Sequence, residues 1–217
     1  MRRSDLVKTG EVDHADWNYR PLLGWIQRLR LGWVCSMLEG QRFERLLEVG
    51  YGSGVFMPAL CEYCHELYGM DIHGKVEEVR NALASNGVAA RLYSGSVSKM
   101  SFPDDYFGCI VCVSTLEFVE DLESACEEIE RVLAPNGRVL VVVPGHSKLL
   151  DLGLWVLAGE SAERDYGSRR QHVVPTLLRH FSLEERASIP ETGWIMPRFY
   201  TGLKLRLGAS QTDQPRW

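Results

Sequence analysis

The sequence predicts an α/β protein built on a doubly wound sheet that is mostly parallel. From residue 45 onward, strand-like and helix-like segments alternate, which is the order that gives a parallel sheet with right-handed crossovers. Several strand-like runs are continuously apolar, as strands buried on both faces are. The chain has 217 residues, of which 45% are hydrophobic and 24% charged, and this composition suits one globular domain.

The elements of this core follow in order along the chain. The strand-like runs are RLLEV (45–49), LYGMD (67–71), VAARLYS (88–94), FGCIVCV (107–113) and RVLVVVP (138–144). The helix-like segments are residues 55–66, 74–86 and 121–133. The second ends at Asn86-Gly87 and the third before Pro135-Asn136-Gly137, and both combinations favour a helix stop or a turn.

An amphipathic helix is expected before the core, over residues 20–40. Apolar side chains recur there at helical spacing, namely Leu22, Ile26, Leu29, Trp33 and Met37. We expect this helix to lie over the core. A helix on a membrane surface is the alternative, because Arg20, Arg28 and Arg30 accompany two tryptophans.

The segment after residue 144 predicts a lid or substrate-binding insertion. Residues 145–172 are half apolar and half charged without a clean period, and they are too many for an ordinary loop. A short helix around VVPTLLRHF (173–181) and two late strands follow, and we expect an antiparallel strand at this end of the sheet. We therefore expect one domain over 1–217, with a helical cap (1–44), a core (45–144), a lid with C-terminal strands (145–207) and a loose tail (208–217).

Charge and cysteine content exclude several classes of function. The net charge of −5 gives no general attraction to nucleic acid. The first residues contain two arginines without an apolar segment behind them, and no run is long enough to span a membrane, so a cytoplasmic protein is expected. The cysteines are Cys35, Cys61, Cys64, Cys109, Cys112 and Cys126. Cys109 and Cys112 would face opposite sides of a strand, whereas Cys61 and Cys64 could share a helical face. We expect buried, reduced thiols and no metal.

The glycine-rich stretch LLEVGYGSG (46–54) indicates a ligand site after the first strand. A dinucleotide would need a third glycine where Val55 stands, and its pyrophosphate would be repelled by Glu48. An amino acid ammonium would instead be attracted. S-adenosylmethionine (SAM) has an ammonium, a sulfonium and no phosphate, so Glu48 favours SAM. Asp71, at the end of the second strand, suits the ribose of either ligand.

Four blocks resemble class I SAM-dependent methyltransferases, in particular the ubiquinone/menaquinone-biosynthesis-like (methyltransferase type 11) subgroup. They are LLEVGYGSG, YGMDI (68–72), SKMSFPDDYFGCIVCVSTLEFVED (98–121) and EEIERVLAPNGRVLVVVP (127–144). They occur in the family's order across the middle of the chain. The resemblance implies a Rossmann-like fold, SAM as cofactor, and methyl transfer to a small-molecule or lipid-like acceptor that leaves S-adenosyl-L-homocysteine (SAH).

The resemblance also implies a set of SAM-binding residues. Backbone contacts would come from Gly50, Tyr51, Gly52 and Gly54, an ammonium contact from Glu48, ribose contacts from Asp71, adenine contacts from Ile72, Ser96 and Val97, and a sulfonium site from Val113 and Ser114. Two alternatives stay open. Val113 could be plain core, and Asp71 could cap the following helix.

The sequence departs from the family pattern at three positions. Ser96 and Gly108 each stand where aspartate is usual, and Phe118 replaces the histidine of "LEHV", which leaves Glu117 alone. If the acceptor must lose a proton, the candidate bases are Glu117, His146, His172 and Tyr19. Glu117 could instead point outward or cap the helix that begins near Asp121.

Two other functions compete with methyl transfer. The departures favour a non-catalytic SAM-binding or interaction module, and a nicotinamide oxidoreductase is the third possibility. The block Asn-Pro-Pro-Tyr is absent after the fourth strand, which disfavours nucleic acid as substrate. The expected partner is a small-molecule or lipid-like acceptor, with peripheral membrane contact possible, for a monomer or homodimer.

Overall fold

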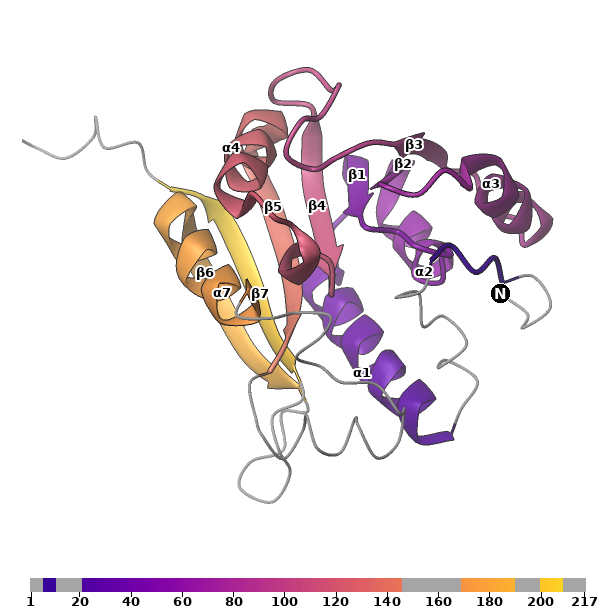
Figure 1. Cartoon of the computed structure of the whole chain (residues 1–217), viewed down its shortest axis with the longest axis horizontal. Coiled ribbons are helices and arrows are strands. Elements are labelled where there is room, and N and C mark those ends of the chain that lie inside the picture. Colours follow the sequence, from indigo (N-terminus) through magenta and orange to yellow (C-terminus); the bar gives the residue numbers. More distant parts are fainter. Residues whose placement is uncertain (1–5, 11–20, 146–168, 190–199, 209–217) are drawn as a thin grey trace, which may run out of the picture.

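The computed structural model describes residues 6–10, 21–145, 169–189 and 200–208, and its described strands form one sheet (Figure 1). The strands are β1 (Phe43–Val49), β2 (Cys64–Asp71), β3 (Arg91–Ser94), β4 (Phe107–Val113), β5 (Leu133–Pro144), β6 (Phe181–Ile189) and β7 (Tyr200–Leu207). Their order across the sheet is β3-β2-β1-β4-β5-β7-β6. Strands β1 to β5 pair in parallel, and β7 is antiparallel to both neighbours. The predicted fold class is confirmed.

Helices cover both faces of this sheet (Figure 1). They are α1 (Pro21–Leu38), α2 (Met57–Leu60), α3 (Val76–Ser85), α4 (Leu122–Val132) and α7 (Arg169–His180), with 3-10 turns η3 (Cys61–Tyr63) and η4 (Leu116–Phe118). One buried cluster packs α4 and α7 against the sheet, and a second packs α1, α2 and α3 against the other face. The continuously apolar strands are explained by this arrangement, because both faces are covered.

The register brings three strand ends to one edge of the sheet. Glu48 in β1 lies opposite Gly69 in β2 and Val111 in β4. The carboxyl ends of β2, β1 and β4 are therefore neighbours. In open α/β sheets, ligands bind outside the carboxyl ends of the strands, where the strand order reverses. Here that reversal lies between β1 and β4.

The helix predicted over residues 55–66 is wrong in its second half. The α-helix ends at Leu60, one 3-10 turn follows, and β2 begins at Cys64. Phe43 of β1 pairs with Cys64, so the strand starts three residues earlier than predicted. The edge of β1 needs backbone partners along its whole length, and this tertiary requirement overrides the local helical pattern. Cys61 and Cys64 consequently do not share a helical face.

Helix α1 lies over the core, as expected, with Leu29 and Met37 of the predicted stripe packed against the core cluster, but its most buried face is rotated from that stripe. Ile26, Leu29 and Met37 are only half-buried, whereas Trp33, Val34 and Leu38 are buried together with the polar residues Gln27 and Arg30. The Trp33 ring lies so close to Gly202 of β7 that a Cβ there would be 2.5 Å from it. This contact sets the rotation of α1 about its axis.

Two residues that suggested a membrane-surface helix therefore face the protein. Arg30 and Trp33 are 8% and 5% exposed, respectively, so neither is available to a lipid surface. Among the described residues, no helix is long and apolar enough to cross a membrane.

The cysteines are free thiols, as expected. Cys109 and Cys112 belong to the clusters on opposite faces of the sheet, which confirms the alternation argued for this strand. Cys35 and Cys61 are half-buried, and the other four are buried. Within the described ranges, no group of three or more His, Cys, Asp or Glu side chains is placed to hold a metal ion.

Candidate functional site

The glycine loop after β1 is tightly held. Gly50, Gly52 and Gly54 have φ of 73°, 50° and 73°, in the left-handed region that disfavours other residues. The Gly50 N–H donates to Met70 O at 2.7 Å, which ties the loop to β2. A Cβ on Gly50 would lie 2.2 Å from Thr115 Oγ1, so this position also excludes a side chain by crowding.

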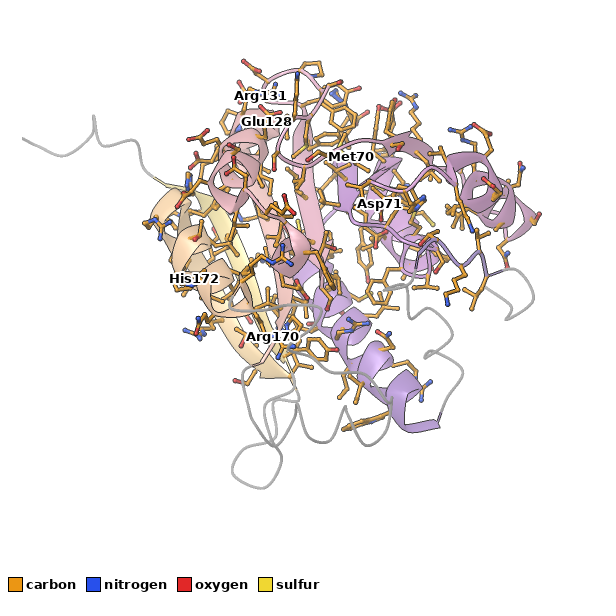
Figure 2. The ribbon with its side chains drawn as sticks, in the orientation of Figure 1. Met70, Asp71, Glu128, Arg131, Arg170 and His172 are labelled. Carbon is orange, nitrogen blue, oxygen red and sulfur yellow. The ribbon has the colours of Figure 1, made fainter. Side chains whose placement is uncertain are left out.

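Asp71 holds the middle of this loop. Its Oδ2 accepts a hydrogen bond from the Gly52 N–H at 2.8 Å, and a ring nitrogen of His73 lies 3.0 Å from Gly52 O. The alternative role of Asp71, a cap for the following helix, is wrong. Helix α3 begins five residues later, at Val76, and its N-cap residue is Lys75. Figure 2 labels Asp71 where β2 meets the loop.

Glu48 is a buried acid at the end of β1. It is 3% exposed, and its Oε2 has no hydrogen-bond partner among the described residues. Burial raises the pKa of Glu48 well above its usual range, and the negative charge of Asp71 adds to this rise. A carboxyl group in this position is costly to bury unless a donor satisfies it, so the site is suited to a cationic ligand group.

The residues expected near adenine differ in exposure. Ile72 is 82% exposed, which is unusual for a large apolar side chain and leaves it available to an aromatic ring. Ser96 is exposed and Val97 is buried. The Tyr51 side chain is 2% exposed and belongs to the core, so Tyr51 can offer a ligand only its backbone.

The end of β4 contains the residues expected beside the sulfonium. Val113 is 8% exposed and packs in the core cluster on the α1 side. Ser114 has a positive φ of 51°, which is uncommon outside glycine. Its hydroxyl accepts a hydrogen bond from Arg30 Nη1 at 2.7 Å. Helix α1 thus contacts the residue that directly follows β4.

Glu117 is fully buried in η4. The alternatives in which it points outward or caps the next helix are wrong, because Asp121 is the N-cap of α4 and accepts from the Ser124 N–H at 3.0 Å. Neither Glu117 oxygen has a hydrogen-bond partner within the described part of the chain. Burial raises the pKa of Glu117 to about 7, and the charges of Arg30 and Arg170 oppose that rise. A carboxylate with this pKa can exchange a proton near neutral pH.

The other candidate bases receive less support. His172 is exposed on α7. Figure 2 labels both His172 and Arg170 on this helix. In contrast to His172, Arg170 is buried, with 5% exposure. Tyr19 and His146 lie outside the described residues, as does nearly all of the predicted lid. Of the four candidates, Glu117 is the buried one among those the structure describes.

Arg30 and Gln27 are site residues that sequence reasoning missed. Both are 8% exposed, and both belong to the face of α1 that packs on the protein. The signal was present in the sequence, because Gln27, Arg30 and Trp33 follow one another at a spacing of three residues, and Val34 lies four residues after Arg30. Polar residues on the same stripe as a buried tryptophan indicate a buried polar site.

Comparisons with known proteins show that the chain is similar to methyltransferases. A family model described as a methyltransferase domain matches residues 47–141. The uncharacterised methyltransferase YcgJ of Bacillus subtilis (strain 168) is 32% identical over 114 residues, covering 52% of this chain and 45% of YcgJ. The ubiquinone/menaquinone biosynthesis C-methyltransferase UbiE of Vibrio cholerae is 30% identical over 126 residues, covering 55% of this chain and 48% of UbiE. The chain thus spans about half the length of these relatives.

A solved structure extends the likeness to most of the fold. The N-methyltransferase NodS of Bradyrhizobium japonicum WM9, in complex with SAH, superimposes with a TM-score of 0.64 at 18% identity. The match covers 93% of this chain and 95% of NodS. At this identity the likeness shows a shared Rossmann-like fold.

Proposed function

We propose that the protein, whose residues 47–141 match a methyltransferase domain, transfers a methyl group from SAM to a small-molecule acceptor as a class I methyltransferase, leaving SAH. The observation that supports this most is the buried carboxyl of Glu48 beside a glycine loop. NodS, which shares the fold, is in complex with SAH, and UbiE is named for a small-molecule pathway. Lipid-like acceptors belong to the same proposal.

The residues present fit SAM. Glu48 Oε2 is a buried acceptor without a partner among the described residues, and the methionine ammonium would supply its donor. The Gly50 and Gly52 backbone would approach the ligand closely because no side chain stands there. Asp71 would exchange its contact with the Gly52 N–H for ribose hydroxyls, or share it with them.

The adenine and sulfonium ends of the ligand would use the remaining residues. Ile72 is exposed and would pack on the adenine, with Ser96 and Val97 at its edge. Val113 and Ser114 would line the sulfonium end. Because Ser114 is held by Arg30, α1 would help to fix this end of the site.

The chain's own contribution to catalysis would be positioning, exclusion of water and proton acceptance. Bound SAM supplies a methyl group on a cationic sulfur. Displacement at that methyl needs the acceptor in line, so holding both partners in a buried site supplies much of the rate. Glu117 is buried near the strand end and would accept a proton from an acceptor that must lose one.

The competing functions differ from this proposal in their ligands. A nicotinamide dinucleotide would place pyrophosphate near the buried Glu48, where no positive charge of the described loop compensates it. A non-catalytic SAM-binding module would bind SAM in the same way but release no SAH. Ser96 and Gly108, where the family has Asp, and Phe118, where it has His, are the departures that favour that second possibility.

The organisation and setting of the molecule complete the proposal. Residues 1–217 would form one domain, with a cap over 1–44, a core over 45–144, a lid with two strands over 145–207 and a tail over 208–217. We retain a cytoplasmic location, a monomer or homodimer, and nucleic acid as an improbable substrate as parts of this proposal.

The test is SAH formation from SAM in the presence of a panel of small acceptors that offer hydroxyl, amine or carbon nucleophiles. The full chain should release SAH with at least one class, and the double variant Glu48→Gln/Asp71→Ala should release none. SAM binding without SAH formation across the panel would favour the non-catalytic module.

A further inference from the structure

A group of buried and half-buried polar side chains beside η4 extends from the sulfonium end of the proposed SAM site. We call Gln27, Arg30, Ser114 and Glu117 the Arg30 cluster. Its members come from α1, from the end of β4 and from η4. Gln27 and Arg30 are each 8% exposed and Glu117 is fully buried. Buried polar groups are nearly always hydrogen-bonded, so their partners need to be accounted for one by one.

Arg30 is positioned by three contacts. Its Nη1 donates to Ser114 Oγ at 2.7 Å, and its guanidinium lies 5.6 Å from the ring centre of Phe56 and 4.9 Å from that of Tyr200. The aromatic rings and the serine fix the plane of the guanidinium. Arg30 Nε is buried and has no hydrogen-bond partner within the described residues. Arg30 Nε is thus a hydrogen-bond donor that is fixed in position and has no acceptor among the described residues.

The cluster also holds acceptors without donors. Both carboxylate oxygens of Glu117 and Oε1 of Gln27 are buried, and none has a hydrogen-bond partner in the part of the chain that the structure describes. Arg30 therefore does not hydrogen-bond Glu117, although its charge acts on it. The cluster thus holds a donor and several acceptors that do not satisfy one another. Leaving such groups buried and unpaired is costly, so a ligand that pairs with them is favoured.

The cluster adjoins the proposed methyl-transfer position. Ser114 directly follows Val113 at the carboxyl end of β4. The next residue, Thr115, has its hydroxyl 3.1 Å from Val49 O, where the glycine loop begins. The chain from Val113 to Glu117 thus runs from the SAM loop to the unpaired carboxylate. An acceptor bound beside the sulfonium site would meet these side chains.

The donor and acceptors together select the ligand chemistry. A purely apolar acceptor would leave all of the unpaired groups buried. An ammonium would satisfy Glu117 and Gln27 but would lie against the Arg30 guanidinium, and a carboxylate would lie against Glu117. A hydroxyl donates one hydrogen bond and accepts others, so it can satisfy Glu117 and Arg30 at once.

We propose that the acceptor presents an ionisable hydroxyl, of the phenol or enol class, to Arg30 and Glu117. This inference rests on the proposed function and names its substrate class. Arg30 Nε donates to the hydroxyl oxygen while a Glu117 oxygen accepts the hydroxyl proton. Arg30 and Glu117 thereby become the residues that select the acceptor.

The proton and electron balance is complete without a further reagent. The O–H bond of the acceptor breaks, an O–H bond forms on Glu117, and the electron pair stays with the acceptor, on its oxygen or shared with the adjacent carbon. That pair forms the new bond to the methyl group. The sulfur–methyl bond breaks, its pair remains on sulfur, and the products are the methylated acceptor, SAH and a proton on Glu117.

The test compares two probes that differ only by a methyl on oxygen. The full chain, saturated with SAH, is dialysed to equilibrium against 4-nitrophenol or 4-nitroanisole, and the bound probe is read by its absorbance. We expect 4-nitrophenol to bind about tenfold more tightly, which is the ratio that one good hydrogen bond gives. The bound phenol should also show more phenolate absorbance than the free probe at the same pH.

Matched variants separate the cluster from a general effect. Arg30→Gln and Glu117→Gln should each reduce the preference to about twofold or less and remove the extra phenolate absorbance. Arg28→Gln on the same helix and Glu120→Gln beside η4 are controls, since both residues are exposed, and they should keep the wild-type preference. A cooperative thermal melt close to that of the wild type shows that each variant is folded.

The outcomes distinguish this inference from the proposed function. If the wild-type chain does not bind SAH, the proposed function fails and this inference fails with it. If SAH binds but 4-nitroanisole binds as tightly as 4-nitrophenol, or neither probe binds, only the hydroxyl inference is overturned. Tighter binding of 4-nitroaniline or 4-nitrobenzoate than of 4-nitrophenol overturns it as well.

Discussion

At the scale of single residues, the burial of Glu48 favours a ligand-binding role for the carboxylate that precedes the glycine loop. It is buried at a strand end, its Oε2 has no partner among the described residues, and its pKa is raised well above its usual range by burial and by Asp71. A group whose folded-state pKa is raised reduces stability as pH rises, because the unfolded chain gives up the proton more readily. Ionised Glu48 therefore destabilises the empty protein, and a bound cationic group would compensate its charge.

The variant Glu48→Gln separates binding from stability. It should weaken SAM binding by roughly 1.5–3 kcal/mol, because a charge-assisted hydrogen bond is lost. Its free energy of unfolding should equal or exceed that of the wild type, and the advantage should grow as pH rises through the raised pKa of Glu48. Calorimetric titration with SAM and denaturant unfolding at several pH values measure both. Unchanged SAM affinity would remove Glu48 from the site.

Glu117 gives the expected pH dependence of turnover. A base must be deprotonated to act, so kcat should rise with pH through the pKa of about 7. The charged groups that act on Glu117 are Arg30 from α1 and Arg170 from α7, while the pKa of the neighbouring Cys112 thiol is raised by burial so that it stays protonated. Glu117→Gln should lose this rise. A variant with the wild-type pH profile would show that positioning alone suffices.

The same residues show how far sequence reasoning reaches. The acid-glycine pattern indicates Glu48 and the glycines, and the acid at the end of the second predicted strand indicates Asp71, since backbone conformation and local charge follow from residue type. The burial of Glu117 could not be predicted, because it depends on which way η4 turns and on helices far away in the sequence. For the same reason, Arg30 was considered only as support for the alternative of a membrane-surface helix.

At the scale of elements, the rotation of α1 is set by the contact between Trp33 and Gly202. A Cβ at Gly202 would lie 2.5 Å from the Trp33 ring, so Gly202→Ala should reduce the free energy of unfolding by about 1–3 kcal/mol through overpacking. A Cβ on Gly32, also in α1, would meet no atom within 4 Å, and Gly32→Ala should stabilise the helix by about 0.5–1 kcal/mol. Chemical denaturation measures both, and equal effects would contradict this docking.

Helix α7 is held to α4 by a surface ion cluster. The ring nitrogens of His180 lie 2.7 Å from Glu123 and 3.2 Å from Glu130, and Arg179 also pairs with Glu123. Burial lowers the pKa of His180, but its hydrogen bonds to the two glutamates outweigh this, and the net pKa is raised.

A raised folded-state pKa makes this cluster sensitive to pH. The stability from His180 should be fully present below its unfolded pKa, near about 6.5, and lost as pH rises through the folded value. His180→Gln should therefore lower Tm in mildly acidic buffer and have little effect in alkaline buffer. Thermal melts of both proteins across this range test the sign, and a loss that grows with pH would refute it.

Element order was predictable, but element limits and faces were less so. The alternation of apolar runs and amphipathic segments determines a doubly wound sheet, because only that arrangement covers both faces of buried strands. Residues 55–66 have a helical pattern, yet their last part completes the pairing of β1 with β2. The local sequence pattern does not show that a neighbouring strand needs these residues for backbone pairing.

At the scale of the whole molecule, the site joins both layers of helices at one edge of the sheet. Helix α1 contributes Arg30 from one face of the sheet, and α7 contributes Arg170 from the other face. The Nη1 of Arg170 donates a hydrogen bond to Gly145 O at 3.2 Å. Both charges act on Glu117. The glycine loop and Asp71 lie at the same edge, beyond β1 and β2. The residues proposed for cofactor and acceptor thus lie where the strand order reverses.

The central claim is that this edge of the sheet binds SAM, and calorimetric titration of the full chain with SAM and with NAD tests it most directly. SAM should bind with one site per chain and NAD should give no binding heat. Asp71→Ala should weaken SAM binding by roughly 1.5–3 kcal/mol, about tenfold to a hundredfold in affinity. Binding of NAD without SAM, or SAM affinity that is unchanged in Asp71→Ala, would contradict the claim.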